Sequence, residues 1–190
     1  MRKNVFVRKL FALFLVGVLA LSLTGCRRSY SVGEVDGTTY TNKWAEVKVS
    51  LPSDYVMMDK SQMGRVSNGF EVACVFCKNN ATKVPLCAVM TREGDVDINQ
   101  IGEEFTQEFG GTGGSTTIQQ GGTTVQVTIN KDYYTIAGES FLCFHMSLSV
   151  GDVYCAFREI DDTGVFAICV VTLTGGDESE EDIFNMFKEL

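Results

Sequence analysis

The sequence predicts an α+β fold, a central antiparallel β-sheet with helices on both of its faces. The first observation is that three apolar segments, at 141–150, 153–160 and 165–173, are separated only by short polar turns. The second is that two segments, beginning near Asp97 and Glu180, space their apolar residues as amphipathic helices do. The third is that both faces of the three strands are apolar, so each face needs a covering layer.

The amino-terminal part of the predicted domain begins with β-structure. Asp36 and Gly37 form a turn pair between residues 32–35 and 38–40, which indicates a small hairpin. The segment from 44 to 51 then alternates between apolar and polar residues, so it is predicted to be a half-buried strand. Its inward-facing residues are predicted to be Ala45, Val47, Val49 and Leu51.

The middle of the chain continues with strands and then changes to a helix. Segments 70–77 and 86–91 are apolar and are divided by a polar turn, which predicts two further strands. Asp97 is a typical N-cap residue with Gln100 three positions later, so a helix is predicted to begin there and to end at Gly110. Its apolar stripe is predicted to consist of Ile98, Ile101, Phe105 and Phe109.

The strands that follow this helix can be placed relative to one another. Residues 110–122 are predicted to form a flexible loop, with a small hairpin as the alternative, and 123–129 an alternating strand. Turns at 151–152 and 161–164 set the registers of the last three strands. One face is then predicted to carry Phe144, Met146, Leu148, Val150, Cys155, Phe157, Ile168 and Val170. The opposite face is predicted to carry Cys143, His145, Ala156, Ile160, Ala167, Cys169, Val171 and Leu173.

The carboxy-terminal segment is predicted to be the second covering helix. The acidic residues of 177–182 lie at its amino end, where the helix dipole favours negative charge. Its apolar stripe is predicted to consist of Ile183, Phe184, Met186, Phe187 and Leu190.

The amino terminus has the features of an export signal. Its first nine residues include Arg2, Lys3, Arg8 and Lys9 but no acid. The apolar run 10–23 that follows is shorter than the ~20 residues that a membrane-spanning helix needs. The segment is therefore predicted to be a cleaved signal peptide.

The end of this signal resembles the lipobox of bacterial lipoproteins, in the residues Leu23, Thr24, Gly25 and Cys26. The resemblance implies that residues 1–25 are removed and that Cys26 receives a covalent diacylglyceryl lipid. Two acyl chains hold a protein firmly at a membrane, so the resemblance implies an anchored protein on the extracytoplasmic face of the cell membrane. An ordinary cleaved signal followed by a coincidental cysteine is the alternative.

The composition limits what the remaining chain can be. Residues 26–37 are predicted to be the lipidated cysteine and a tether, and residues 38–190 a single domain, which we expect to be monomeric. Removal of the signal leaves 12 basic and 24 acidic residues, a formal charge of −12. This charge argues against nucleic acid as a partner, because nucleic-acid-binding proteins cluster Lys and Arg.

The chain also resembles a known superfamily in several short segments. These are residues 40–42, the stretch from Trp44 through Pro52 to Tyr55, residues 138–141, and the final order of strand, acidic loop and helix. In these segments the chain looks like the PsbP-like superfamily, in particular its small clostridial-type lipoproteins. The resemblance implies an α/β/α sandwich that binds or assists other proteins, and it carries no catalytic motif over to this chain.

The six cysteines after Cys26 are predicted to be small buried apolar residues. Cys74 and Cys77 have CxxC spacing but lie in a predicted strand, which puts their Cα atoms ~10 Å apart on opposite faces. Cys143 and Cys169 are predicted to share a face but to be separated by the middle strand, ~9–10 Å apart. A disulfide needs less than ~7 Å between Cα atoms. One bridge that involves Cys74, Cys77 or Cys87 stays open as an alternative.

The only histidine marks one candidate polar or thiol cluster, which consists of Cys143, His145, Arg158 and Cys169. His145 is predicted to lie opposite Arg158, and a structural role is favoured, because no orienting third group for a Cys–His nucleophile is evident. A zinc site at this cluster would lack a fourth ligand. The sequence thus predicts no catalytic residues, no metal ligands, and no cofactor other than the lipid on Cys26.

Together these observations predict a cell-surface lipoprotein with a non-catalytic domain. Its expected partners are the membrane, through the lipid, and a protein or peptide. A solute-binding lipoprotein is one alternative, which would need a pocket with convergent polar groups. A thiol-dependent enzyme is another, which would need an exposed, acidic cysteine beside His145.

Overall fold

The computed structural model describes residues 28–59, 69–81, 83–107, 115–120 and 123–190. In this part of the chain no helix is long and apolar enough to cross a membrane. The predicted signal and lipobox, with Leu23, Thr24, Gly25 and Cys26, lie outside the described residues, as do Phe109 and Gly110 of the predicted first helix.

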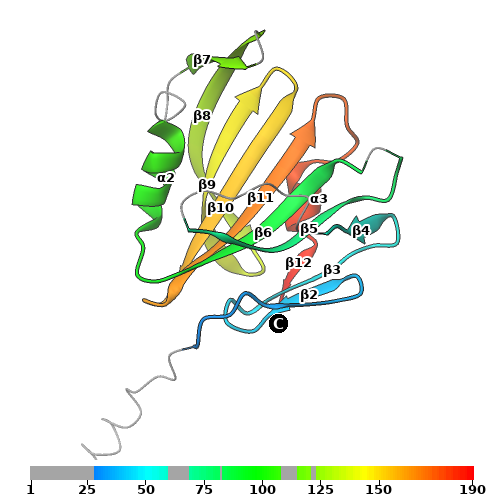
Figure 1. Cartoon of the computed structure of the whole chain (residues 1–190), viewed down its shortest axis with the longest axis vertical. Coiled ribbons are helices and arrows are strands. Elements are labelled where there is room, and N and C mark those ends of the chain that lie inside the picture. Colours follow the sequence, from blue (N-terminus) through cyan, green and yellow to red (C-terminus); the bar gives the residue numbers. More distant parts are fainter. Residues whose placement is uncertain (1–27, 60–68, 82, 108–114, 121–122) are drawn as a thin grey trace, which may run out of the picture.

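The described chain forms two antiparallel sheets and two short helices (Figure 1). The large sheet has the spatial order β4 (Tyr55–Met57), β5 (Glu71–Lys78), β6 (Pro85–Glu93), β11 (Gly164–Leu173), β10 (Gly151–Ile160), β9 (Glu139–Leu148), β8 (Thr123–Ile136) and β7 (Ser115–Gln120). The small sheet has the order β1 (Glu34–Asp36), β2 (Thr39–Asn42), β3 (Val47–Ser50) and β12 (Phe187–Glu189). The helices are α2 (Ile98–Gln107) and α3 (Glu180–Phe184).

The predicted antiparallel arrangement of the last three long strands is confirmed. Strands β9, β10 and β11 are consecutive in space, and both pairs are antiparallel. The predicted inward face of β3 is also confirmed, because Val47 and Val49 are fully buried and the flanking Ala45 and Leu51 are buried too. Local turns and alternation were therefore sufficient for the order and direction of these strands, although the turn predicted at 151–152 lies at 149–150, where Leu148 pairs with Gly151.

The predicted register of β11 is wrong by one residue. The turn between β10 and β11 contains three residues, 161–163, so Ile160 pairs with Gly164. The turn closes through the Thr163 backbone N–H, which donates to the Ile160 carbonyl oxygen at 3.1 Å. A shift of one residue moves every side chain of a strand to the other face. Ile168 and Val170 therefore lie on the face predicted for Cys169, and Cys169 lies on the face predicted for them.

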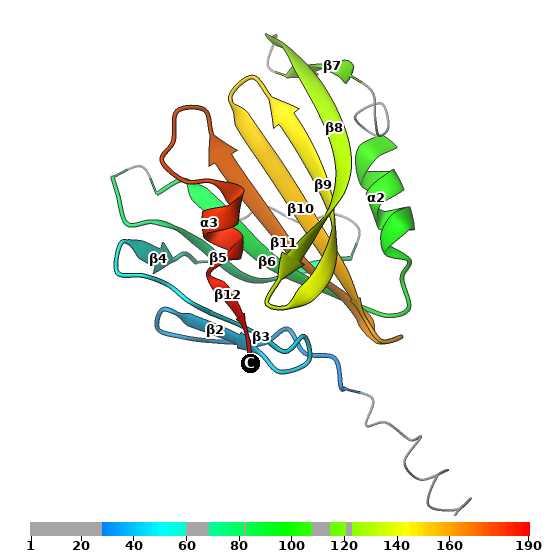
Figure 2. The ribbon, with the colours of Figure 1, turned by 180° about the vertical axis from the view of Figure 1, so that it is seen from behind.

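The first cluster is the hydrophobic core between the two sheets, on the face of the large sheet that also carries α3. It includes Tyr40, Trp44, Val47, Val49, Phe76, Phe141, Phe166, Ile168, Ile183, Phe184 and Phe187. In Figure 2 α3 and the small sheet lie in front of the large sheet, where the sequence had predicted a helix alone. The second sheet was missed because its members are three or four residues long and come from both ends of the chain.

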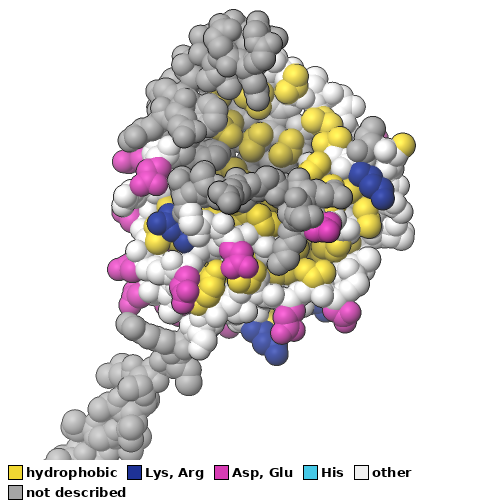
Figure 3. Space-filling model, viewed as in Figure 1, with side chains coloured by type: hydrophobic (Ala, Val, Ile, Leu, Met, Phe, Trp, Pro, Cys, Tyr) yellow, Lys and Arg dark blue, Asp and Glu magenta, His cyan; other side chains and the backbone are white. Residues whose placement is uncertain are grey.

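The second cluster lies on the opposite face of the large sheet. It includes Ile101 of α2 with Val127, Ile129, Leu142, Phe144, Met146, Cys155, Phe157, Val165 and Ala167, and Cys169 packs against it. Figure 3 shows apolar side chains gathered over this face, which is turned away from α3.

The carboxy terminus does not continue as the predicted helix. Helix α3 begins with Ser179 as N-cap, in a capping box with Asp182, and ends at Phe184. The chain then extends, and Phe187 pairs with Val49 at the edge of the small sheet. The predicted helical stripe is therefore wrong beyond Phe184. Phe187 is buried, but as a residue of strand β12, and Leu190 is exposed.

The predicted tether is partly folded. Tyr30 packs edge-on against Trp44, with ring centroids 5.0 Å apart, and its hydroxyl is 2.9 Å from Thr91 Oγ1. Arg28 forms an ion pair with Glu46 at 2.7 Å. Arg28 and Tyr30, within the segment predicted to be a tether, therefore already contact the domain.

Two further differences concern the edges of the large sheet. The small-hairpin alternative for 110–122 is correct for its described part, because β7 pairs with β8. Strand β8 continues to Ile136, beyond its predicted end at residue 129. The extension was not predicted, because residues 130–135 are mostly polar and exposed and do not alternate with apolar residues. Strand β4 was not predicted, because three residues carry too little pattern.

We expect Phe187→Ala to lower the free energy of unfolding by about 3–5 kcal/mol, because the truncation leaves a cavity in the first cluster. Leu190→Ala, at a side chain that is 53% exposed, should change it by no more than about 0.5 kcal/mol. Urea unfolding measures both. Equal midpoints for the two variants would show that β12 does not close the core.

A second prediction concerns the contact between α2 and the large sheet. Alanine usually stabilises a helix by ~1 kcal/mol relative to glycine. A Cβ atom at Gly102 would instead overlap the ring of Phe144, so we expect Gly102→Ala to destabilise the protein by about 1–3 kcal/mol. Glu104→Ala, on the exposed side of α2, is the control for helix propensity in the same urea experiment. A more stable Gly102→Ala protein would contradict this packing.

Candidate functional site

The structure separates the candidate cluster that the sequence predicted. His145 lies opposite Tyr154, not opposite Arg158, and the two rings stack with centroids 4.2 Å apart. Its Nε2 is 3.0 Å from Asp152 Oδ1 and 3.2 Å from Ser147 Oγ. Both contacts use the same ring nitrogen, so the three residues do not form the relay of a catalytic triad, which needs both nitrogens.

Arg158 joins the two sheets. Its guanidinium donates a hydrogen bond to the Ala45 carbonyl oxygen and lies 5.4 Å from the centroid of the Phe141 ring. The guanidinium Nη1 is 3.8 Å from the Glu139 carboxylate. Burial lowers the pKa of Arg158. None of these contacts involves His145.

The cysteines are distributed over both faces of the large sheet. Cys143 belongs to the first cluster, whereas Cys169 and Cys155 lie on the second-cluster face, so the prediction that Cys143 and Cys169 share a face is wrong. Burial raises the pKa of Cys143 to about 12 and also raises the pKa values of Cys77 and Cys87. Thiols with raised pKa values stay protonated at neutral pH and are poor nucleophiles. Among the described residues, no group of three or more acidic, cysteine or histidine side chains could hold a metal ion.

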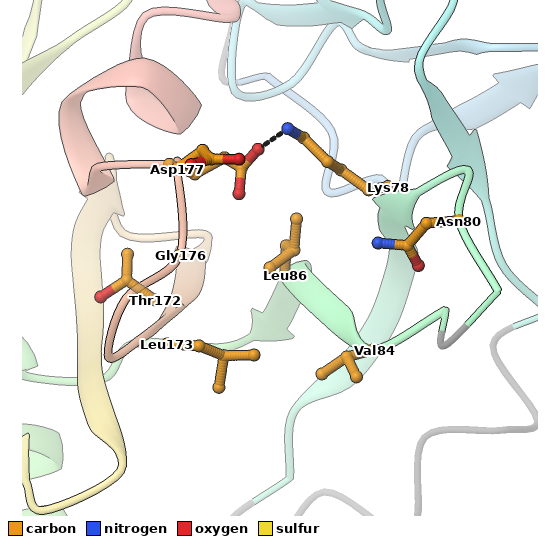
Figure 4. Close-up of a pocket in the computed structure, with 9 residues that line it drawn as sticks. Lys78, Asn80, Val84, Leu86, Thr172, Leu173, Gly176 and Asp177 are labelled. Carbon is orange, nitrogen blue, oxygen red and sulfur yellow. Dashed lines mark ion pairs between the residues drawn. The ribbon is translucent and has the colours of Figure 1, made fainter.

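A cleft opens where strands β6 and β11 stop pairing. The two strands are in register from Gly164 opposite Glu93 to Val170 opposite Cys87. If that register continued, Val84 would lie opposite Leu173. The strands diverge instead and leave a cleft of about 220 Å³ between them (Figure 4).

The cleft has an apolar centre and a charged wall. Leu86 projects into its centre, between the rim residues Val84 and Leu173 (Figure 4). Val84 is 39% exposed and Leu173 46% exposed, so both apolar side chains face solvent. Lys78 and Glu178 form an ion pair in the wall. Thr172, Gly176, Asp177 and Asn80 complete the lining.

A loop adjoins each of the two strands at the cleft. In the loop after β11, the Gly176 backbone N–H donates to the Leu173 carbonyl oxygen at 2.9 Å, and Gly175 takes a φ of 77°, which favours glycine. In the loop before β6, the side-chain oxygen of Asn80 accepts a hydrogen bond from the Lys83 backbone N–H at 3.0 Å. Each loop thus contains a hydrogen bond of its own beside the cleft.

The apolar surface continues beyond the cleft. The turn between β9 and β10 exposes Val150, 66% of which is accessible. The Val150 carbonyl oxygen accepts a hydrogen bond from the Thr174 backbone N–H at 3.1 Å, so this turn lies beside the end of β11. Three of the large apolar side chains that are exposed in the described chain, Val84, Val150 and Leu173, thus belong to one end of the large sheet.

Sequence reasoning did not identify these residues as a site. Leu173 was predicted to be inside the sheet, and Val84 was assigned to no element. The available signal was the unequal length of the apolar runs: the run that ends at Leu173 extends past the last residue that β6 can pair with.

A second hollow of about 280 Å³ lies near the amino terminus and is lined by charged residues, among them Arg28, Glu46, Glu139 and Arg158. Its charges contact one another, as in the Arg28–Glu46 ion pair. This internal pairing makes the cleft between β6 and β11 the stronger candidate site.

Comparison with known proteins adds one similarity. No protein-family model matches the chain, and no curated protein sequence matches it significantly. Among solved structures, the chain is similar to the solution structure of cyanobacterial PsbP (CyanoP) from Synechocystis sp. PCC 6803, with a TM-score of 0.42 and 11% sequence identity. The match covers 89% of this chain and 99% of that chain.

Proposed function

We propose that this protein is a cell-surface lipoprotein, anchored through Cys26, whose domain binds an extended segment of a partner protein without catalysing a reaction. The lipobox-like residues before Cys26 support the anchor. The observation that carries the binding function is the divergence of β6 and β11, which leaves Val84 and Leu173 exposed on either side of Leu86.

The shape of the cleft favours a polypeptide over a small solute. Pockets for drug-sized ligands usually have ~300–1,000 Å³. The cleft, at about 220 Å³, is smaller and lies between two strand ends. Extended peptides are commonly recognised by addition to a strand, with alternate side chains in small pockets. One apolar side chain of the partner would contact Leu86, and its neighbours would contact the rim.

The charges around the cleft favour basic residues next to that apolar side chain. Asp177 lines the cleft, and residues 26–190 carry a formal charge of −12. Glu178 is already paired with Lys78. Because like charges are repelled and opposite charges attracted at such a surface, we infer an apolar segment flanked by Lys or Arg.

The arrangement of the layers is consistent with this site. We infer that α2 and α3 cover opposite faces of the large sheet, because Ile101 packs in the second cluster and Ile183 in the first. The loop that leads into α3 supplies one wall of the cleft, whereas Val84 and Leu173 stay exposed at this end of the sheet.

The thiol-enzyme alternative has less support. The raised pKa of Cys143 opposes formation of a thiolate. His145 is occupied by Asp152 and Ser147 at hydrogen-bond distance and by the stacked Tyr154 ring.

The anchor makes a separate prediction. Replacement Cys26→Ala should abolish incorporation of labelled fatty acid and leave the signal uncut by the lipoprotein peptidase, because the acylated thiol is missing. Cys169→Ala is the control and should retain the label. Labelled fatty acid in the Cys26→Ala protein would refute the lipobox assignment.

For the cleft, a random peptide library is selected on the wild-type domain, and the best enriched peptide is measured against variants. We expect Leu173→Asp to weaken binding at least about tenfold, because a charge at the apolar rim loses the contact and adds a desolvation cost. Fluorescence anisotropy of the labelled peptide gives the affinities.

Val35→Asp is the matched control, because Val35 is 47% exposed, much like Leu173, and belongs to β1 in the small sheet. It should bind the peptide as the wild type does. Failure to enrich any peptide, or equal loss in both variants, would contradict binding at the cleft.

A further inference from the structure

The corrected register brings two cysteines together. Cys155 on β10 and Cys169 on β11 are direct partners across the two strands. Both lie on the second-cluster face, and their thiols are hydrogen-bonded to one another. The pair is therefore held by the two central strands of the large sheet.

The ladder places this pair at a position that suits a disulfide. The Thr174 backbone N–H donates to the Val150 carbonyl oxygen, so residues 150 and 174 form a hydrogen-bonded pair at the end of the β10–β11 ladder. Along an antiparallel ladder, hydrogen-bonded and non-hydrogen-bonded pairs alternate. By this alternation, Cys155 and Cys169 occupy a non-hydrogen-bonded position. At such positions Cα atoms lie ~4.5 Å apart, within the ~4.4–6.8 Å found in disulfides.

The two thiols differ in accessibility. Cys155 is buried, whereas Cys169 is the one half-buried thiol among the six described cysteines. The hydrogen bond to Cys169, followed by burial, raises the pKa of Cys155. An external reagent thus reaches Cys169 first, and Cys155 is positioned to react second.

We propose that Cys155 and Cys169 form a reversible cross-strand disulfide by exchange with an external disulfide compound. The Cys169 thiolate attacks one sulfur of that compound, whose S–S bond breaks and releases one thiolate, which takes a proton from water. Cys155 then loses its proton, and its thiolate attacks the Cys169 sulfur and releases the second thiol. Two protein thiols are oxidised, and one external disulfide is reduced to two thiols.

The bond is expected to be easily reduced. Cβ atoms of directly opposed residues lie ~4.5–5.5 Å apart, whereas a disulfide brings them to ~3.5–4.5 Å. The sheet must adjust to form it, and strained disulfides are the labile ones.

The other cysteines are placed less favourably. Cys143 lies on the opposite face of the sheet from Cys155. Cys74 pairs with Val89, and Cys87 pairs with Phe76, so Cys74 and Cys87 are diagonal neighbours. Diagonal positions lie ~7–8 Å apart, beyond the usual disulfide range.

This inference does not depend on the cleft or on its partner. An extracytoplasmic location would supply oxidising conditions, but the reaction itself is tested with added oxidised glutathione.

The reduced full-length protein is incubated in mild detergent with oxidised glutathione, alkylated, digested with trypsin and analysed by mass spectrometry. The expected product has lost two hydrogen atoms and joins peptide 132–158 to peptide 159–188, which are separated by cleavage after Arg158. Peptide 132–158 also contains Cys143, so a Cys143→Ala protein is tested in parallel and should give the same link.

Single variants separate the two steps. Cys155→Ala should trap a glutathione adduct on Cys169, because the resolving thiol is absent, and Cys169→Ala should form neither adduct nor link. Dithiothreitol should restore both thiols in the wild type. No linked peptide in the folded wild type, or a link lost in Cys143→Ala, would overturn the proposal, whatever the outcome for peptide binding.

Discussion

The three-residue turn 161–163 is the constraint on which the rest of the large sheet depends. Its Thr163 hydroxyl donates to the Ile160 carbonyl oxygen at 2.7 Å and accepts a hydrogen bond from Trp44 Nε1, also at 2.7 Å. The next residue, Gly164, has no room for a Cβ atom, because the Arg92 carbonyl oxygen and the Trp44 ring lie against it. The turn therefore ties β10, β11, β6 and the connection between β2 and β3 to one register, and a slip by one residue would break several contacts at once.

Two features of β11, one in its middle and one at its end, follow from this register. It places Cys169 opposite Cys155 on the second-cluster face. It also determines where the pairing of β6 with β11 ends, at Cys87 and Val170. Leu173, beyond this last pair, is not paired with β6 and forms one rim of the cleft. A local hydrogen-bonded turn thus determines both the thiol pair and the proposed binding surface.

The sequence predicted the parts of the fold whose signals are local. The antiparallel β9–β10–β11 unit followed from tight turns, and the buried face of β3 followed from the alternation around Val47 and Val49. Strand β12 was predicted as helix, because Phe184 and Phe187 fit helical spacing and its real partner, Val49, is distant in the chain. The cleft was not predicted, since it arises where two strands fail to pair. The predicted cluster of Cys143, His145, Arg158 and Cys169 was wrong for two reasons. The turn between β9 and β10 lies at 149–150 and not at 151–152, which moves His145 away from Arg158. The turn between β10 and β11 has three residues and not four, which moves Cys169 to the other face.

The pairing of β12 with β3 has a consequence for the order in which the two sheets assemble. Phe187 and Val49 are distant in the chain, so a long loop must close before the two residues can pair. Until it closes, Val47 and Val49 lack the neighbour that Phe187 provides. The hairpins β9–β10 and β10–β11 need only short loops, so the small sheet is expected to be completed after them.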